Sequence, residues 1–119
     1  MNTMQSFLML FYLLDQCFDD CPEESLGGLL GAISPELWRD GQPADKAVLL
    51  DWEKFSRRET VNAQNIVRII CDFLECYENQ FGFNFAQTKR WLLSQASEKN
   101  IRTAAEKTAD IYKRFEYVN

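Results

Sequence analysis

The sequence predicts an all-α fold, a compact bundle of five or six helices that forms a single domain over residues 1–119. Two observations carry this prediction. Apolar side chains recur at spacings of three and four over long segments, which is the period of an amphipathic helix. The chain also holds only three prolines and five glycines, whereas strand-rich folds place such residues at frequent turns. A chain of this length is large enough to form a core without a metal or a disulfide.

The first helix is predicted over residues 4–18. Its apolar side chains follow helical spacing: Met4, Phe7, Leu8, Phe11, Leu14 and Phe18. Further apolar residues widen this stripe, so we expect neighbouring helices on several sides. The run resembles a signal peptide at first sight, but it lacks basic residues and a small-residue cleavage site. We therefore interpret it as the first core helix of a cytoplasmic protein.

The second helix is predicted over residues 22–33. Asp20 or Cys21 would be its N-cap, and Pro22 would take the first helical position, where the missing N–H is tolerated. Glycine costs about 1 kcal/mol relative to alanine inside a helix. Close approach of another helix would explain why this short segment holds three of them: Gly27, Gly28 and Gly31.

A corner follows the second helix, with a turn predicted over residues 35–41. The dipeptide Asp40-Gly41 favours a turn. The third helix is predicted over residues 43–57. Asp45 would be at its third position, where a carboxylate accepts backbone N–H bonds or meets the positive end of the helix dipole.

The fourth helix is the most strongly periodic segment, predicted to begin at residue 59 or 60 and to end at Phe81. Gly82 would form its left-handed cap. Asn84 is predicted to cap a fifth helix, and a sixth is predicted over residues 98–117. The sequence leaves open whether the last two are separate helices or one bent helix.

Few residues suggest catalysis. The chain has no histidine, which excludes Ser-His and Cys-His nucleophilic systems. The glycine cluster matches neither the dinucleotide-binding fingerprint nor the P-loop. We expect the four cysteines to be buried, reduced thiols rather than zinc ligands or disulfides: Cys17, Cys21, Cys71 and Cys76. The prediction is therefore a non-enzymatic protein with no catalytic residue, metal site or cofactor, and a carboxylate enzyme with a divalent metal is a distant alternative.

The charge is unevenly distributed. Residues 1–60 hold 11 acidic and 5 basic side chains, a net charge of −6, whereas residues 61–119 have a net charge of +1. An acidic half repels nucleic acid and anionic membranes, so we expect neither as a partner. No apolar run is long enough to cross a bilayer. The acidic half suits a basic protein partner, and the alternative is an ordinary solvated surface.

The candidate partner-binding surface consists of side chains around the two proline corners. Its members are Asp19, Asp20, Glu23, Glu24, Glu36, Trp38 and Asp40. Unpaired carboxylates are costly to bury, so they are expected on the outside. Trp38 has two interpretations. It either fills the core beneath the loop, which we favour, or stands out as an anchor for the partner.

One segment carries a family resemblance. From Leu26 to Trp52 the chain reads L-G-G-L-L-G-x-I-S-P-x-L-W-x-D-G-x-P-A-D-x-A-x-x-x-D-W. It resembles a segment of small, mostly uncharacterised bacterial helical proteins, in which Leu-Leu-Gly/Ser precedes a turn, Asp-Gly-x-Pro-Ala-Asp and a tryptophan. Some of these are thought to be immunity or antidote proteins of toxin systems. Their segment often continues Asp-Pro-Ala, whereas this chain has Lys46 after Asp45.

These observations lead to two functional hypotheses. The first is a protein-binding protein, in its sharpest form an immunity protein whose acidic half covers a basic toxin, with charge complementarity speeding association. The second is a small structural or adaptor domain that associates with itself through exposed apolar helix faces.

Overall fold

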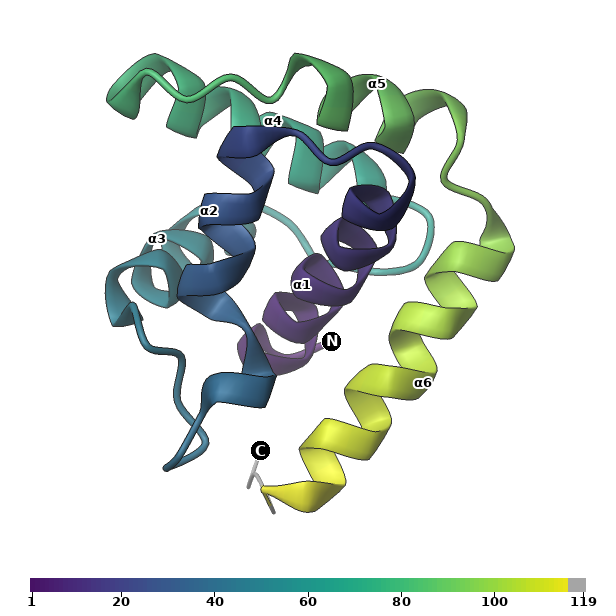
Figure 1. Ribbon diagram of the computed structural model, residues 1–119. Helices are drawn as coiled ribbons and strands as arrows, with labels where there is room; N and C mark the ends of the chain where they lie inside the picture. Colours follow the sequence, from purple (N-terminus) through teal and green to yellow (C-terminus); the bar gives the residue numbers. More distant parts are fainter. Residues whose placement is uncertain (116–119) are drawn as a thin grey trace.

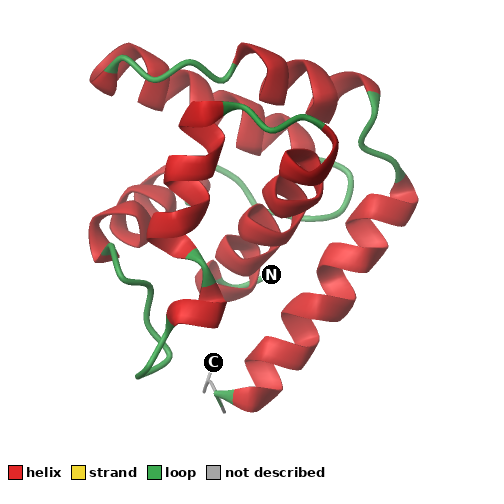
Figure 2. Ribbon diagram, in the orientation of Figure 1, coloured by secondary structure: helices red, strands yellow, loops and turns green. Residues whose placement is uncertain are grey.

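The computed structural model describes residues 1–115, which form six α-helices, one short 3₁₀ helix and no β-strand (Figures 1 and 2). The elements follow in the order α1 (Thr3–Asp20), α2 (Glu24–Ile33), η1 (Pro35–Leu37), α3 (Lys46–Ser56), α4 (Ile66–Phe81), α5 (Ala86–Ser94) and α6 (Glu98–Arg114). The predicted all-α bundle is confirmed, and α5 and α6 are separate helices. The radius of gyration, 13.2 Å, is that of a compact chain of this size.

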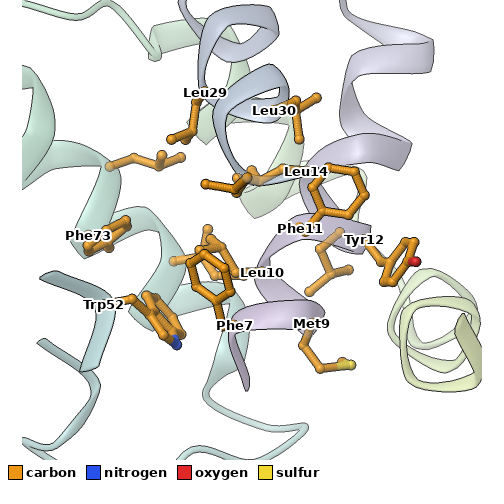
Figure 3. Packing of buried hydrophobic residues seen from close by; sticks show 14 of the residues in the cluster. Phe7, Met9, Leu10, Phe11, Tyr12, Leu14, Leu29, Leu30, Trp52 and Phe73 are labelled. Carbon is orange, nitrogen blue, oxygen red and sulfur yellow. The ribbon is translucent and has the colours of Figure 1, made fainter. Parts of the chain in front are cut away.

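Helix α1 lies at the centre and contacts each of the other five α-helices (Figure 1). Every residue from Ser6 to Leu14 is buried, as expected of a helix that is apolar on all sides. Around it gather side chains from several elements, including Leu29 and Leu30 of α2, Trp52 of α3 and Phe73 of α4 (Figure 3). The expectation of neighbours on several sides is confirmed.

Helices α1 and α6 pack side by side in antiparallel directions (Figure 1). At one end, Asn2 Nδ2 donates to the Tyr112 hydroxyl over 2.7 Å. At the other end, Gln16 Nε2 donates to the carbonyl of Asn100 over 3.0 Å. Both helices begin with a reciprocal capping box, which satisfies backbone N–H groups that a helix start leaves open.

The start of α2 differs from the prediction. The helix begins at Glu24, so Pro22 precedes it instead of opening it. Asp20 still belongs to α1 and Cys21 is the C-cap of that helix, so neither is the N-cap of α2. That position is held by Glu23, whose side chain makes no capping bond to α2 because it binds another helix, as described below.

The starts of α3 and α4 also differ. Helix α3 begins at Lys46 rather than residue 43, and Asp45 is its N-cap rather than its third residue. The predicted chemistry is confirmed, since Asp45 Oδ1 accepts the Ala47 N–H over 3.0 Å. Helix α4 begins at Ile66 rather than residue 59 or 60. The preceding residues form a turn in which Asn62 Oδ1 accepts the backbone N–H groups of residues 64 and 65, a side-chain alternative to helical bonding.

Three glycines have structural roles. Gly41 has φ of +78°, a left-handed backbone that suits glycine, in the predicted turn at residues 35–41. Gly82 has φ of +74° and ends α4 in the left-handed conformation, as predicted. A Cβ on Gly27 would lie 3.1 Å from the Phe18 ring of α1, so this glycine allows close approach of the two helices. Gly28 and Gly31 have no neighbour within 4 Å of such a Cβ, and the close approach expected there is not formed.

The remaining predicted boundaries are the start of α5 and the end of α6. Phe85 is the N-cap of α5 by backbone geometry, but Asn84 Oδ1 accepts the Ala86 N–H over 3.0 Å, so its side chain caps the helix as predicted. Helix α6 ends at Arg114. The predicted end at Tyr117 lies outside the described residues.

Candidate functional site

The structure divides the predicted acidic surface between the two ends of α2 (Figure 1). Four of its carboxylates lie beside the N-terminal end of that helix: Asp19, Asp20, Glu23 and Glu24. Glu36 and Asp40 follow its C-terminal end. A ten-residue helix is about 15 Å long. A separation of this size fits within one protein surface, so the shared surface stays a prediction.

Two of these carboxylates, the exposed Asp20 and the partly exposed Glu23, connect helices by hydrogen bonds. Glu23 accepts the N–H groups of Gln87 and Thr88 at 3.1 and 3.0 Å, and the Thr88 hydroxyl at 2.8 Å. It therefore caps the N-terminus of α5. Asp20 Oδ2 accepts the indole N–H of Trp91 over 3.1 Å. Sequence reasoning missed both roles because a cap supplied by a distant segment leaves no local pattern.

The other predicted site residues are mostly exposed. Asp19 and Glu24 are exposed on the surface. Glu36 lies 3.9 Å from the Arg114 guanidinium, and Asp40 accepts the Gln42 N–H of its own turn over 3.1 Å.

Trp38 is buried. Its ring lies 6.0 Å from that of Phe115, so it fills the core beneath the loop, which is the interpretation we favoured. Its side chain is not available as an exposed anchor in this structure.

The four cysteines are free thiols. Cys17 and Cys71 are buried as expected, whereas Cys21 and Cys76 are partly exposed, so the expectation that all four are buried is wrong for these two. Burial raises the pKa of Cys17 to about 12 and the pKa of Cys71 to about 11. Both remain protonated at neutral pH and are poor nucleophiles. Within residues 1–115, no group of three or more potential ligand side chains is placed to hold a metal ion.

Two exposed phenylalanines and the buried tyrosine beneath them form an aromatic edge, which we define as Tyr77, Phe81 and Phe83. The side chains of Phe81 and Phe83 are 59% and 41% exposed. Both rings contact Tyr77, with centroids 5.2 and 6.2 Å from it, and lie 6.1 Å from each other. The run Phe81-Gly82-Phe83-Asn84-Phe85 was the available sequence signal, but we interpreted it only as a helix end followed by a cap.

Local contacts hold this edge in place. Gly82 reverses the chain between the two phenylalanines. Glu78 Oε2 accepts the Phe85 N–H over 2.7 Å and its other oxygen pairs with Lys89 of α5. Although burial alone would raise the pKa of Glu78, these bonds lower it below the usual value, and the pairing raises the pKa of Lys89. The loop that carries Phe83 is therefore fixed at both ends.

A groove of about 320 Å³ lies next to the aromatic edge, with Tyr77 among its lining residues. The Tyr77 hydroxyl donates to Asp51 Oδ2 over 2.8 Å. Burial and this bond to a carboxylate raise the pKa of Tyr77. At the groove wall, the Arg58 guanidinium lies 4.5 Å from the centre of the Phe55 ring. The groove therefore offers the Asp51 carboxylate as a hydrogen-bond acceptor and the Arg58 guanidinium as a cation, next to the aromatic edge.

A second groove runs between α1 and α6. It has a volume of about 640 Å³, and its walls include Met9, Ala105 and Ala109. Sequence reasoning did not find it, because it depends on how two helices far apart in the chain pack together.

Comparison of the chain with protein-family models, curated proteins and solved structures finds no match. Within residues 1–115, no helix combines the length and the apolar character that crossing a bilayer requires.

Proposed function

We propose that this protein is a non-enzymatic binding protein of the cytoplasm, which holds another protein at the aromatic edge. The observation that supports this is the exposure of Phe81 and Phe83 side by side. Protein interfaces are enriched in aromatic residues, and exposed apolar side chains that adjoin one another indicate interaction sites. The ordered loop adds to this, because rings already held in place lose little conformational entropy on binding.

The sharpest form of the proposal is an immunity protein whose partner is a basic toxin. The net charge of −5 would attract a basic protein and speed the encounter. Among the predicted site residues, exposed carboxylates such as Asp19 and Glu24 would contribute to this attraction. Asp20 and Glu23 would contribute less, because they bind α5. The proposal also draws on the resemblance of residues 26–52 to a segment of small bacterial helical proteins, some of which are thought to be immunity proteins.

The alternative is that the aromatic edge binds a second copy of this chain. Exposed rings suit such an interface equally well. Sedimentation of the purified protein over a wide concentration range separates the two hypotheses. Self-association through the edge predicts dimers that dissociate on dilution, whereas a dedicated partner predicts a monomer.

The decisive variant is Phe81→Ser with Phe83→Ser. A photo-crosslinking residue at Asn84, which is exposed between the edge and α5, would capture the partner in the native cell. We expect the protein with the native aromatic edge and the control Leu93→Ser to capture the same partner. The double variant should no longer capture it. Leu93 is 71% exposed and lies near the other end of α5. Capture that survives the double variant, in a protein with unchanged circular dichroism, would contradict the proposal.

A further inference from the structure

The groove between α1 and α6 has the dimensions of a ligand site. Its volume of about 640 Å³ falls within the range of small-molecule pockets, about 300–1,000 Å³. Met9 lies on the side of α1 that faces α6 (Figure 3), and Ala105 and Ala109 form the opposite wall one helical turn apart. A flexible methionine and two short side chains leave room for an unbranched apolar chain.

The groove also contains a polar group that lacks a partner. Thr108 lines it with a side chain that is only 6% exposed, and its buried hydroxyl makes no hydrogen bond among the described residues. Buried hydroxyls are nearly always bonded, and leaving one unsatisfied is unfavourable. Threonine in a helix populates two χ1 rotamers. Contact between this hydroxyl and a ligand in the groove would need only a change of rotamer, which leaves the backbone in place.

The charge around the groove selects the ligand's head group. Lys113 lines the groove, is exposed and makes no ion pair among the described residues, and no carboxylate side chain lines the groove. A neighbouring groove, lined by α1, α6 and the segment of Ser34 and Glu36, has three carboxylates and two cations on its walls: Asp15, Glu36 and Asp110 with Lys107 and Arg114. In a chain of net charge −5, the first groove is thus a local site for an anion.

We infer that this groove binds a free alkyl carboxylate, with the alkyl chain along Met9, Ala105 and Ala109 and the carboxylate near Lys113 and the Thr108 hydroxyl. From Ala105 to Lys113, α6 rises about 12 Å, which sets the length of chain that fits. A free acid suits the site better than a lipid of an anionic membrane, because the acidic protein is repelled by such a surface.

The test is a calorimetric titration of the full chain with monomeric sodium decanoate. We expect saturable one-to-one binding and an increase in Tm with ligand concentration. Ala109→Trp, which fills the groove from an exposed position, should abolish binding at concentrations that saturate the native protein, whereas Ala63→Trp in an exposed turn should not. Lys113→Gln should weaken binding about threefold, the size of an exposed ion pair, and Lys99→Gln should have no effect.

Thr108→Val gives an independent readout. Removal of the unpaired hydroxyl should raise the Tm of the unliganded protein while weakening decanoate binding. If Thr108→Val leaves the affinity for decanoate unchanged, Thr108 has only a structural role and does not belong to the site. Non-saturable uptake, equal affinity for decyltrimethylammonium, or binding unaffected by both Ala109→Trp and Lys113→Gln would overturn the inference. Binding to phosphatidylglycerol vesicles without binding to monomeric decanoate would also overturn it.

Discussion

Single side chains hold the proposed binding surface in place, and Glu78 is the clearest case. It lies on α4 and accepts the Phe85 N–H while pairing with Lys89. The side chains of Glu78 and Lys89 are only 18% and 25% exposed. A charged hydrogen bond shielded from water in this way is stronger than a surface pair. Glu78 therefore joins the α4 end, the loop carrying Phe83 and the start of α5.

The first prediction concerns this carboxylate. Because the pKa of Glu78 is lowered from its usual 4.5 in the folded protein, its stabilising contribution is complete above that value and is lost as the pH falls through the lowered folded pKa. We expect Glu78→Gln to reduce the free energy of unfolding by about 1–2 kcal/mol at neutral pH. The difference from the native protein should shrink below pH 4.5.

Urea unfolding at neutral and acidic pH measures this difference. Glu75→Gln is the control, because Glu75 is exposed on the same helix and its replacement should change stability by less than about 0.5 kcal/mol. If the loss of unfolding free energy in Glu78→Gln is the same at neutral and acidic pH, the ionised carboxylate of Glu78 does not supply this stability.

The residue scale also shows why the candidate site was predicted only in part. Asp19, Glu24 and Asp40 were correctly placed outside, because a charged side chain in a polar stretch has no reason to be buried. Trp38 was correctly placed inside. The convergence of Glu23 on α5 could not be predicted, because no periodic or capping pattern links residues that are 65 apart in the chain.

Among the elements, the corner between α1 and α2 is coupled to α5. Glu23 supplies three hydrogen bonds to residues 87 and 88, and these satisfy N–H groups that the start of a helix leaves open. The adjacent Glu24 is in the first turn of α2 and is exposed. The pair offers a direct comparison of a structural carboxylate with a surface carboxylate.

We predict that Glu23→Ala lowers the free energy of unfolding by about 1–3 kcal/mol, as loss of a charged hydrogen-bond acceptor does. Glu24→Ala should cost less than about 0.5 kcal/mol. Chemical denaturation monitored by circular dichroism measures both. Equal effects of the two substitutions would mean that Glu23 does not support α5 in solution.

Element boundaries were predictable where the stop signal is local. Gly82 ends α4 because its left-handed backbone suits glycine, and this can be inferred from the sequence alone. The start of α4 was missed because Asn62 and Asn65 bond the turn before the helix. Asparagine in a polar segment also fits the first turn of a helix, so the pattern alone did not distinguish the two outcomes.

At the scale of the molecule, α1 is the organising element. Glycine and proline are concentrated at residues 26–45, in the second helix and around the predicted turn at residues 35–41. In the structure, that segment contributes buried side chains such as Leu26, Ile33 and Trp38 to one side of the core, whereas the core as a whole gathers around the uninterrupted run from Ser6 to Leu14. The density of unusual residues marks a change of chain direction, whereas apolar side chains on every face of a helix mark its centre.

The position of α1 leads to the last prediction, which concerns the thiols. Cys17 is fully buried in α1 and Cys71 is buried in α4, so reagents reach them only when the packing around α1 opens. Cys21 and Cys76 are partly exposed, and Cys21 Sγ bonds to Gln87 Oε1 over 3.3 Å. Burial also raises the pKa of Cys17 and of Cys71, which lowers the fraction of reactive thiolate in the folded state.

A disulfide reagent should therefore modify two thiols quickly and two slowly. Cys21→Ser with Cys76→Ser should remove the fast phase and leave Cys17 and Cys71. Because α1 contacts all five other α-helices, the remaining thiols should react through global unfolding. Their rate should then rise with urea at the slope set by complete exposure of the core. If the rate of the slow phase does not depend on urea, Cys17 and Cys71 react through local opening around α1 instead. If these two thiols react as fast in the folded protein as in the unfolded chain, the central position of α1 is contradicted.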